Sequence, residues 1–128
     1  MFILESSLDG AAPVIEQAIM TDAEAGVYGE LVSFSSGRLT KTAATGQPVG
    51  ILVQTTAAGT DVATEFLRIR EDAVYVADYT GAEPTKGIEV YRIDATGLLV
   101  DGGANSGGKV AIVSTNTAKT KCRVMFLK

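Results

Sequence analysis

The chain has 128 residues, of which 46% are hydrophobic and 20% are charged, and its formal net charge is −4. This length fits one domain with its own core, and the apolar content excludes a disordered chain. Phosphate-binding surfaces need clustered Lys and Arg, so the excess of acidic residues (15 against 11 basic) argues against a nucleic-acid partner.

Membrane and secretory segments are not expected. No stretch is long and apolar enough to span a bilayer, and the N-terminal sequence lacks the basic and apolar regions of a signal peptide. We therefore expect no membrane partner and synthesis in the cytoplasm of the producing cell. The single cysteine, Cys122, excludes an intrachain disulfide, and its place in an alternating segment predicts a buried thiol that acts as a small hydrophobe.

Short runs of alternating apolar and polar residues recur along the chain, separated by Gly, Ser, Thr, Asp and Asn. This pattern is typical of many short strands. In chain order, strands are expected near residues 2–5, 14–20, 30–34, 38–42, 48–54, 63–70, 73–78, 87–94, 97–101, 109–114 and 121–127. The predicted fold is all-β: a single small β-barrel or sandwich domain of about ten short strands with little helix.

One segment has features of a helix as well as of a strand or loop. In residues 21–28, Thr21 and Glu24 have the spacing of a capping box, but Gly26 and Val27 cut the stretch short. At most one helical turn is expected there. The alternating Lys119, Lys121 and Arg123 are expected to form a solvated strand face.

Three turns are marked by glycine. Phe34–Leu39 and Ile93–Leu98 are predicted hairpins, in which Gly37 and Gly97 supply a positive φ. The glycine-rich segment 101–108 is expected to be a hairpin loop.

That loop also contains a partial nucleotide-binding motif. Residues 103–109 fit the first seven positions of a P-loop, but Val110 stands where a magnesium-binding Ser or Thr is needed. The following residues have strand character, whereas a P-loop opens a helix. A nucleotide cofactor is therefore not expected.

A weak internal similarity aligns Gly46–Ala57 with Gly107–Ala118 without a gap. Two similar β modules over residues 29–70 and 88–127, packed on each other, would explain it. Chance similarity between strand-rich segments would explain it as well.

The sequence is expected to divide into an N-terminal strand or arm over residues 1–12 and a single β domain over 13–128. Phe2, Ile3 and Leu4 form the apolar part of the first segment. They are either a strand of their own domain or an arm that pairs with a sheet edge of another protein, which makes them a candidate oligomer or capsid interface.

Catalytic and metal chemistry have few candidate residues. The chain has no histidine, and one cysteine cannot form a thiolate metal site. Carboxylate pairs such as Glu65 with Glu71 and Asp72, or Asp78 with Glu83, could resemble a glycosidase pair. Sugar-binding grooves need aromatic platforms, and the chain has no Trp. We expect no enzyme, no cofactor and no metal.

The centre of the chain resembles a family. It runs through Gly29–Lys41, then Gly46–Val53 with its Pro-Val-Gly-Ile-Leu strand, then Thr55–Asp61 and the alternating Ala63–Ile69. Over roughly residues 29–79 this order of strands and loops resembles that of the capsid decoration (cement, head-stabilising) proteins of tailed bacteriophages. The chain departs from the lambda type because four further strands follow residue 80. In this length it is more similar to the longer β-tulip-like cement proteins.

The resemblance implies a structural virion protein that binds the major capsid protein on the outer capsid surface and stabilises the expanded head. It implies self-association into a homotrimer or homodimer and no catalytic residues. The alternative function is a β-rich adhesion or receptor- and glycan-binding module of a phage tail or fibre. The scarcity of aromatic residues argues against this alternative.

Overall fold

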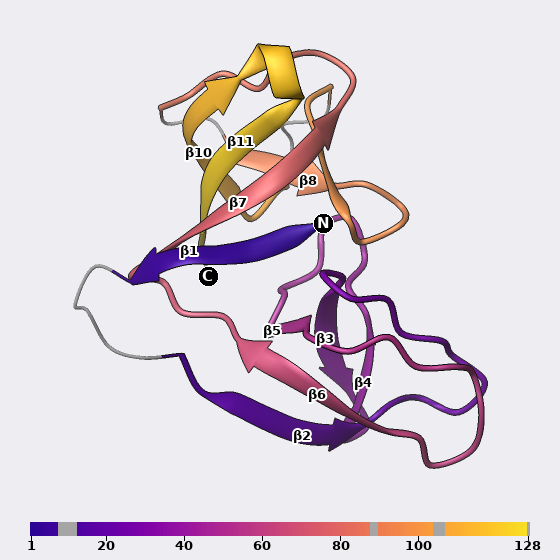
Figure 1. Ribbon diagram of the computed structural model, residues 1–128. Coiled ribbons are helices and arrows are strands. Elements are labelled where there is room, and N and C mark those ends of the chain that lie inside the picture. The colour runs from indigo at the N-terminus through magenta and orange to yellow at the C-terminus, as the bar shows by residue number, and fades with distance from the viewer. Residues whose placement is uncertain (8–12, 88–89, 104–106, 128) are drawn as a thin grey trace.

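The computed structural model describes residues 1–7, 13–87, 90–103 and 107–127 (Figure 1). The described part of the chain forms eleven strands, and the predicted all-β fold is confirmed. The strands are β1 (Phe2–Ser7), β2 (Ile15–Ile19), β3 (Leu31–Ser35), β4 (Arg38–Lys41), β5 (Gly50–Leu52), β6 (Ala63–Arg68), β7 (Ala73–Thr80), β8 (Val90–Ile93), β9 (Leu99–Asp101), β10 (Val110–Asn116) and β11 (Lys121–Phe126).

Each of the eleven predicted strands has a counterpart within a few residues of its expected bounds. Sequence reasoning missed a short 3-10 helix, η1 (Thr117–Lys119), which is closed by Thr120 in the left-handed conformation with φ 54°. It connects β10 to β11. Segment 21–28 forms turns and a bridge but no helix, within the expected limit of one turn.

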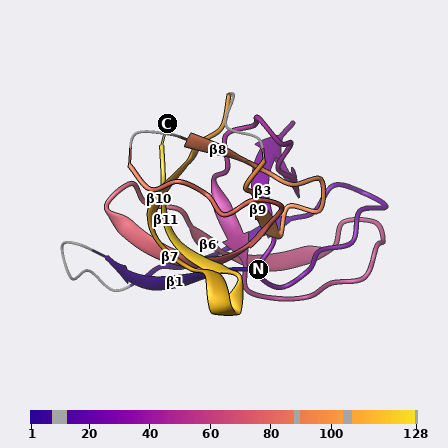
Figure 2. The same cartoon turned by 90° about the horizontal axis from the view of Figure 1, so that it is seen from above.

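The strands form two sheets. Sheet A has the order β1-β7-β11-β10-β8-β9, and a parallel pairing between β7 and β9 closes five of its strands into a barrel. Figure 2 looks down on this circuit. Sheet B has the order β2-β6-β5-β3-β4, and a parallel bridge between Met20 and Leu39 joins its two ends. Sheet A lies above sheet B in Figure 1.

The two barrels have the same topology and the same register. The order β2-β6-β5-β3-β4 corresponds strand by strand to β7-β11-β10-β8-β9, including the parallel contact that closes each circuit. The pairs Leu52–Phe66 and Met20–Leu39 in sheet B match Ile112–Val124 and Tyr79–Val100 in sheet A, which sets the alignment.

Under this alignment, each inward-facing core residue of sheet B has a buried equivalent in sheet A. The pairs are Met20 and Tyr79, Val32 and Tyr91, Leu39 and Val100, Leu52 and Ile112, and Phe66 and Val124. The weak sequence similarity instead aligned Ile51 with Ile112, one residue away from the structural register. Each barrel also includes one strand that precedes the range expected for its module. This strand is β2 in sheet B and β7 in sheet A.

A shared apolar layer joins the barrels. In sheet B, Val32, Leu52 and Phe66 fill the barrel, while their neighbours Leu31, Ile51 and Leu67 belong to the same buried cluster as the core of sheet A. Strands β3, β5 and β6 therefore bury residues on both faces, which explains the uninterrupted apolar run of β5 in the sequence.

The two predicted hairpins are confirmed. Ser36 and Gly37 both have positive φ (50° and 78°) between β3 and β4, the geometry of a tight hairpin turn, and the turn at Gly97 (φ 73°) joins β8 to β9. The expectation that residues 101–108 form a hairpin loop is wrong, because β8 lies between β9 and β10 in the sheet. Residues 104–106 of that loop lie outside the described residues.

Candidate functional site

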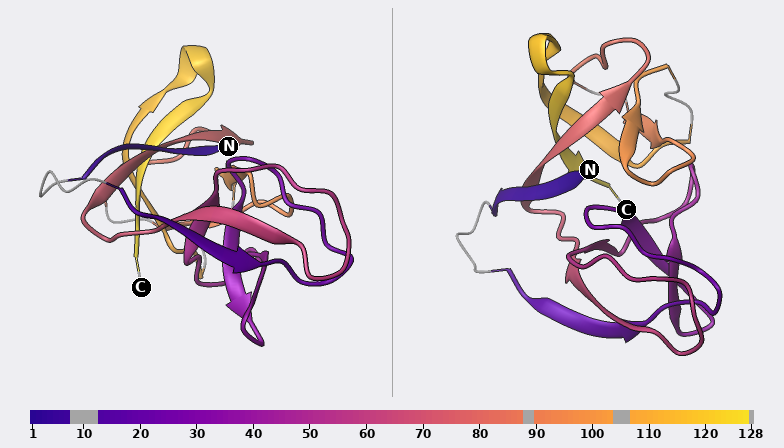
Figure 3. Two further views of the ribbon diagram at one scale, coloured as in Figure 1. Left: turned by 60° about the horizontal axis from the view of Figure 1, so that its bottom comes forward. Right: turned by 45° about the vertical axis from the view of Figure 1, so that its right-hand side comes forward.

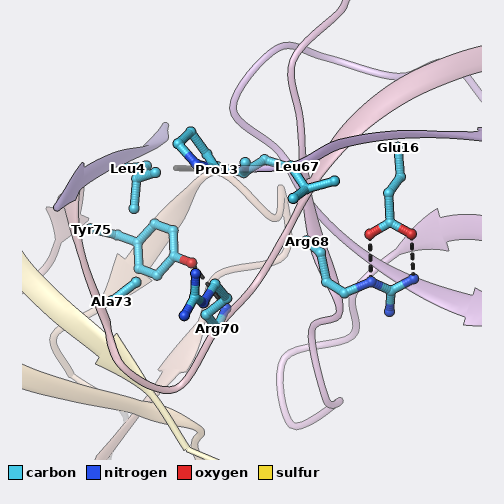
Figure 4. A pocket seen from close by; sticks show the side chains of 9 residues that line it. Leu4, Pro13, Glu16, Leu67, Arg68, Arg70, Ala73 and Tyr75 are labelled. Atoms are coloured by element: carbon cyan, nitrogen blue, oxygen red, sulfur yellow. Dashed lines mark hydrogen bonds and ion pairs between the residues drawn. The ribbon is translucent and has the colours of Figure 1, made fainter. Parts of the chain in front are cut away.

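An apolar groove lies between β1 and β2, and we call it the β1–β2 groove. It consists of two hollows of about 230 and 260 Å³, which share Leu4, Pro13 and Leu67 in their linings. β1 and β7 of sheet A form one side, and β2 and β6 of sheet B form the other (Figures 1 and 4).

Exposed apolar side chains gather around this groove. Ile3, Val14, Ile15 and Tyr28 line it, and each is among the exposed large hydrophobic residues of the chain. Clustered exposed apolar side chains are uncommon on monomeric proteins and mark surfaces that bind other molecules. The groove is therefore the candidate functional site.

An ion pair borders the sheet B side of the groove (Figure 4). The Arg68 guanidinium donates two hydrogen bonds to the Glu16 carboxylate, at 2.5 and 2.9 Å. These bonds lower the pKa of Glu16 and raise that of Arg68. The guanidinium carbon also lies 5.7 Å from the ring centroid of Phe66, a cation–π distance. This pair fixes a charged rim beside an apolar floor.

The sheet A side is closed by Tyr75. Its hydroxyl accepts a hydrogen bond of 3.1 Å from the Arg70 backbone N–H, and its ring packs edge-on against Phe126 with centroids 5.2 Å apart. Burial raises the pKa of Tyr75. Arg70 donates to Asp72 at 2.9 and 3.0 Å. The hydroxyl is thus held in place rather than presented as a reactive group.

The three residues of the candidate interface have different surroundings. Phe2 is 1% exposed and packs in the core of sheet A, with its ring centroid 5.7 Å from that of Phe126. Ile3 is 46% exposed, and Leu4 is half-buried; both line the β1–β2 groove. β1 itself pairs antiparallel with β7 of its own chain.

Three of the five carboxylates considered for catalysis have structural partners, and Glu65 is exposed on β6. Asp72 pairs with Arg70, Asp78 accepts from Lys121 at 2.7 Å, and Glu83 accepts from the Thr115 hydroxyl at 2.6 Å. Within the described ranges, no group of three or more His, Cys, Asp or Glu side chains could hold a metal ion. Lys121 and Arg123 are exposed on β11, as expected for a solvated strand face, and Arg123 pairs with Glu5 at 2.9 Å. The expectation that Lys119 belongs to the same strand is wrong, because Lys119 lies in η1.

The segment after the partial P-loop motif is β10, which begins at Val110. A strand presents no helix N-terminus to a phosphate. The sequence prediction of strand character at this position is confirmed.

The expected burial of Cys122 is confirmed, since it is a free thiol within the core of sheet A. Burial and the nearby Asp78 carboxylate raise the pKa of the thiol to about 11. Because the thiolate is the reactive form, Cys122 should resist labelling by an aromatic disulfide reagent in the native protein at pH 8 and react readily in denaturant. Rapid stoichiometric labelling of the folded protein would contradict this placement.

Comparisons with known proteins found no family model, no curated protein and no solved structure that matches this chain. In the part of the chain that the structure describes, no helix is long and apolar enough to cross a membrane.

Sequence reasoning did not locate the groove, although it named Ile3 and Leu4. The missed residues include Pro13, Val14 and Tyr28, which come from two separate segments. One signal was available: Val14 and Ile15 are consecutive apolar residues at the start of a strand, so both faces of that strand carry apolar side chains.

Proposed function

We propose that this protein is a structural virion protein that binds the outer surface of a phage capsid and stabilises the expanded head as a homo-oligomer. The assignment to a virion comes from the resemblance of residues 29–79 to capsid decoration proteins. The observation that supports a docking role is the β1–β2 groove, where exposed Ile3, Val14 and Ile15 surround an apolar floor. Docking through such a groove buries apolar surface, which is the main favourable term in association.

Capsid binding can be tested by co-sedimentation. Purified protein is mixed with expanded heads from a phage that lacks this gene, and with unexpanded heads as a comparison. The proposal predicts saturable binding to expanded heads, and decorated heads should release their DNA at a higher temperature than bare heads. Oligomers bound at several sites at once would retain tight binding even where each contact is weak.

A matched pair of variants tests the groove. Ile3→Asp places a charge in the groove and should weaken head binding by about tenfold or more, because a charge in an apolar contact must be desolvated. Val113→Asp changes an exposed apolar residue of β10 that does not line the groove, and it should leave binding unchanged. Equal loss in both variants, or no binding by the unmodified protein, would refute the proposal.

A further inference from the structure

The equivalence of the two barrels shows that one sheet edge is covered in sheet A and bare in sheet B. In sheet A, β1 adds antiparallel to β7 along residues 73–77, beside the point where β9 continues the same edge. The equivalent residues of sheet B are 14–18 in and before β2. In the described part of the chain, no strand pairs with that edge at residues 14–18. β4 lies beside the end of β2, where Met20 forms a parallel bridge with Leu39.

The position of β2 leaves this edge accessible. The right-hand view of Figure 3 shows β2 along the margin of the molecule, with β6 on its inner side. Edge strands of soluble proteins are commonly protected by outward lysines, prolines or bulges. The outward face of β2 instead carries Ile15 and Ile19, 50% and 40% exposed, with the uncharged Gln17 between them.

We infer that β2 pairs antiparallel with β2 of a second copy of this chain, around a two-fold axis at Gln17. In this register Ile15 lies opposite Ile19 of the second copy and Glu16 lies opposite Ala18. The outward face thus forms two Ile–Ile pairs that flank a Gln–Gln pair, and no two like charges are directly opposed. The two sheets B become one continuous sheet with an isologous interface.

The side chains on the inward face of β2 favour pairing with a second copy of this chain over pairing with an apolar strand such as β1. In sheet A, Phe2 of β1 lies opposite Ala77 and packs on Phe126. The residues of sheet B equivalent to Ala77 and Phe126 are Ala18 and Arg68. The two-fold register places Glu16 of the second copy opposite Ala18, in the position of Phe2. A carboxylate therefore arrives beside a guanidinium that already binds Glu16 of its own chain, where sheet A brings two aromatic rings together.

This inference names the surface of the self-association in the proposed function, but it holds for the isolated protein whether or not a capsid is bound. A five-residue strand pair buries less surface than a permanent dimer interface, so the dimer should be weak and populated at concentrations of the order of 100 µM. The Glu16–Arg68 contacts across the axis make the association weaker at high salt.

Cysteine cross-linking tests the register. Antiparallel pairing brings the two Gln17 Cα atoms to about 4.5–5.5 Å, within disulfide range, so Gln17→Cys should form a disulfide-linked dimer under mild oxidation. Glu65→Cys is the matched control: Glu65 is exposed and lies opposite Gln17 on β6, one strand further from the axis. It should stay monomeric on the same gel.

Sedimentation equilibrium provides the second readout. The unmodified protein should show a concentration-dependent monomer–dimer equilibrium, and Gln17→Lys, which opposes two ammonium groups on the axis, should weaken it at least about tenfold. A wild-type protein that stays monomeric at this concentration overturns the inference, as does equal cross-linking of Gln17→Cys and Glu65→Cys. Head binding by such a monomer would leave the capsid-binding part of the proposed function standing and would overturn its homo-oligomer.

Discussion

Replacing Phe2 with alanine should lower the free energy of unfolding by about 3–5 kcal/mol, the usual cost of removing a buried phenylalanine ring. Phe2 is fully buried, packs on Phe126 and anchors β1 against β7. Phe126 in turn packs on Tyr75, so the truncation would open a cavity beneath an aromatic cluster. Urea unfolding followed by tyrosine fluorescence would measure the loss.

The neighbouring residue supplies the control. Ile3 lies on the same strand but points outward beside Val76, so Ile3→Ala should change stability by no more than about 0.5 kcal/mol. The contrast separates the two sequence hypotheses for residues 2–4. A strand of its own domain requires the large difference between the variants, whereas a free arm would give small and similar effects for both.

The strands were predictable because their signals are local. Alternation at β7 and β11, and glycine at the β3–β4 turn, depend on residues within a few positions of each other. Burial of Cys122 followed from the same alternation. These features need no knowledge of which strands become neighbours.

The pairing of strands and the groove were not predictable in this way. β7 pairs with β11 more than forty residues later, and alternation along a strand does not specify its partner. Leu31, Ile51 and Leu67 look like ordinary core residues, yet they form the layer between two barrels. The β1–β2 groove depends on that arrangement, since it lies where strands of the two sheets face each other.

Glu30 gives the second large expected effect, because it is a carboxyl group buried beside the junction of the barrels. It is 5% exposed and precedes β3, and the next residue, Leu31, donates a backbone hydrogen bond of 2.9 Å to the Gly97 carbonyl in the β8–β9 turn. Oε1 of Glu30 has no hydrogen-bond partner among the described residues. Burial raises its pKa to about 7, against the opposing influence of Lys41 and with a further rise from Glu24.

The sign of the pH dependence follows from this rise. Between the ordinary pKa of 4.5 and the folded value of about 7, the folded protein binds a proton that the unfolded chain has released. The contribution of Glu30 to the free energy of unfolding is therefore fully present below about pH 4.5. It falls as the pH rises to about 7, by about 3 kcal/mol in total. Above that range the contribution is constant, because both states are ionised.

Glu30→Gln isolates this contribution, since an amide of nearly the same shape cannot ionise. The variant should lack the loss of stability that the unmodified protein shows between pH 5 and pH 8 in urea unfolding. Glu65→Gln, at an exposed carboxylate, should retain the wild-type pH profile. If the Glu30→Gln and wild-type curves run parallel, Glu30 is ionised in the folded state throughout. Its charge must then be compensated at the barrel junction, and the carboxyl would be no source of pH dependence.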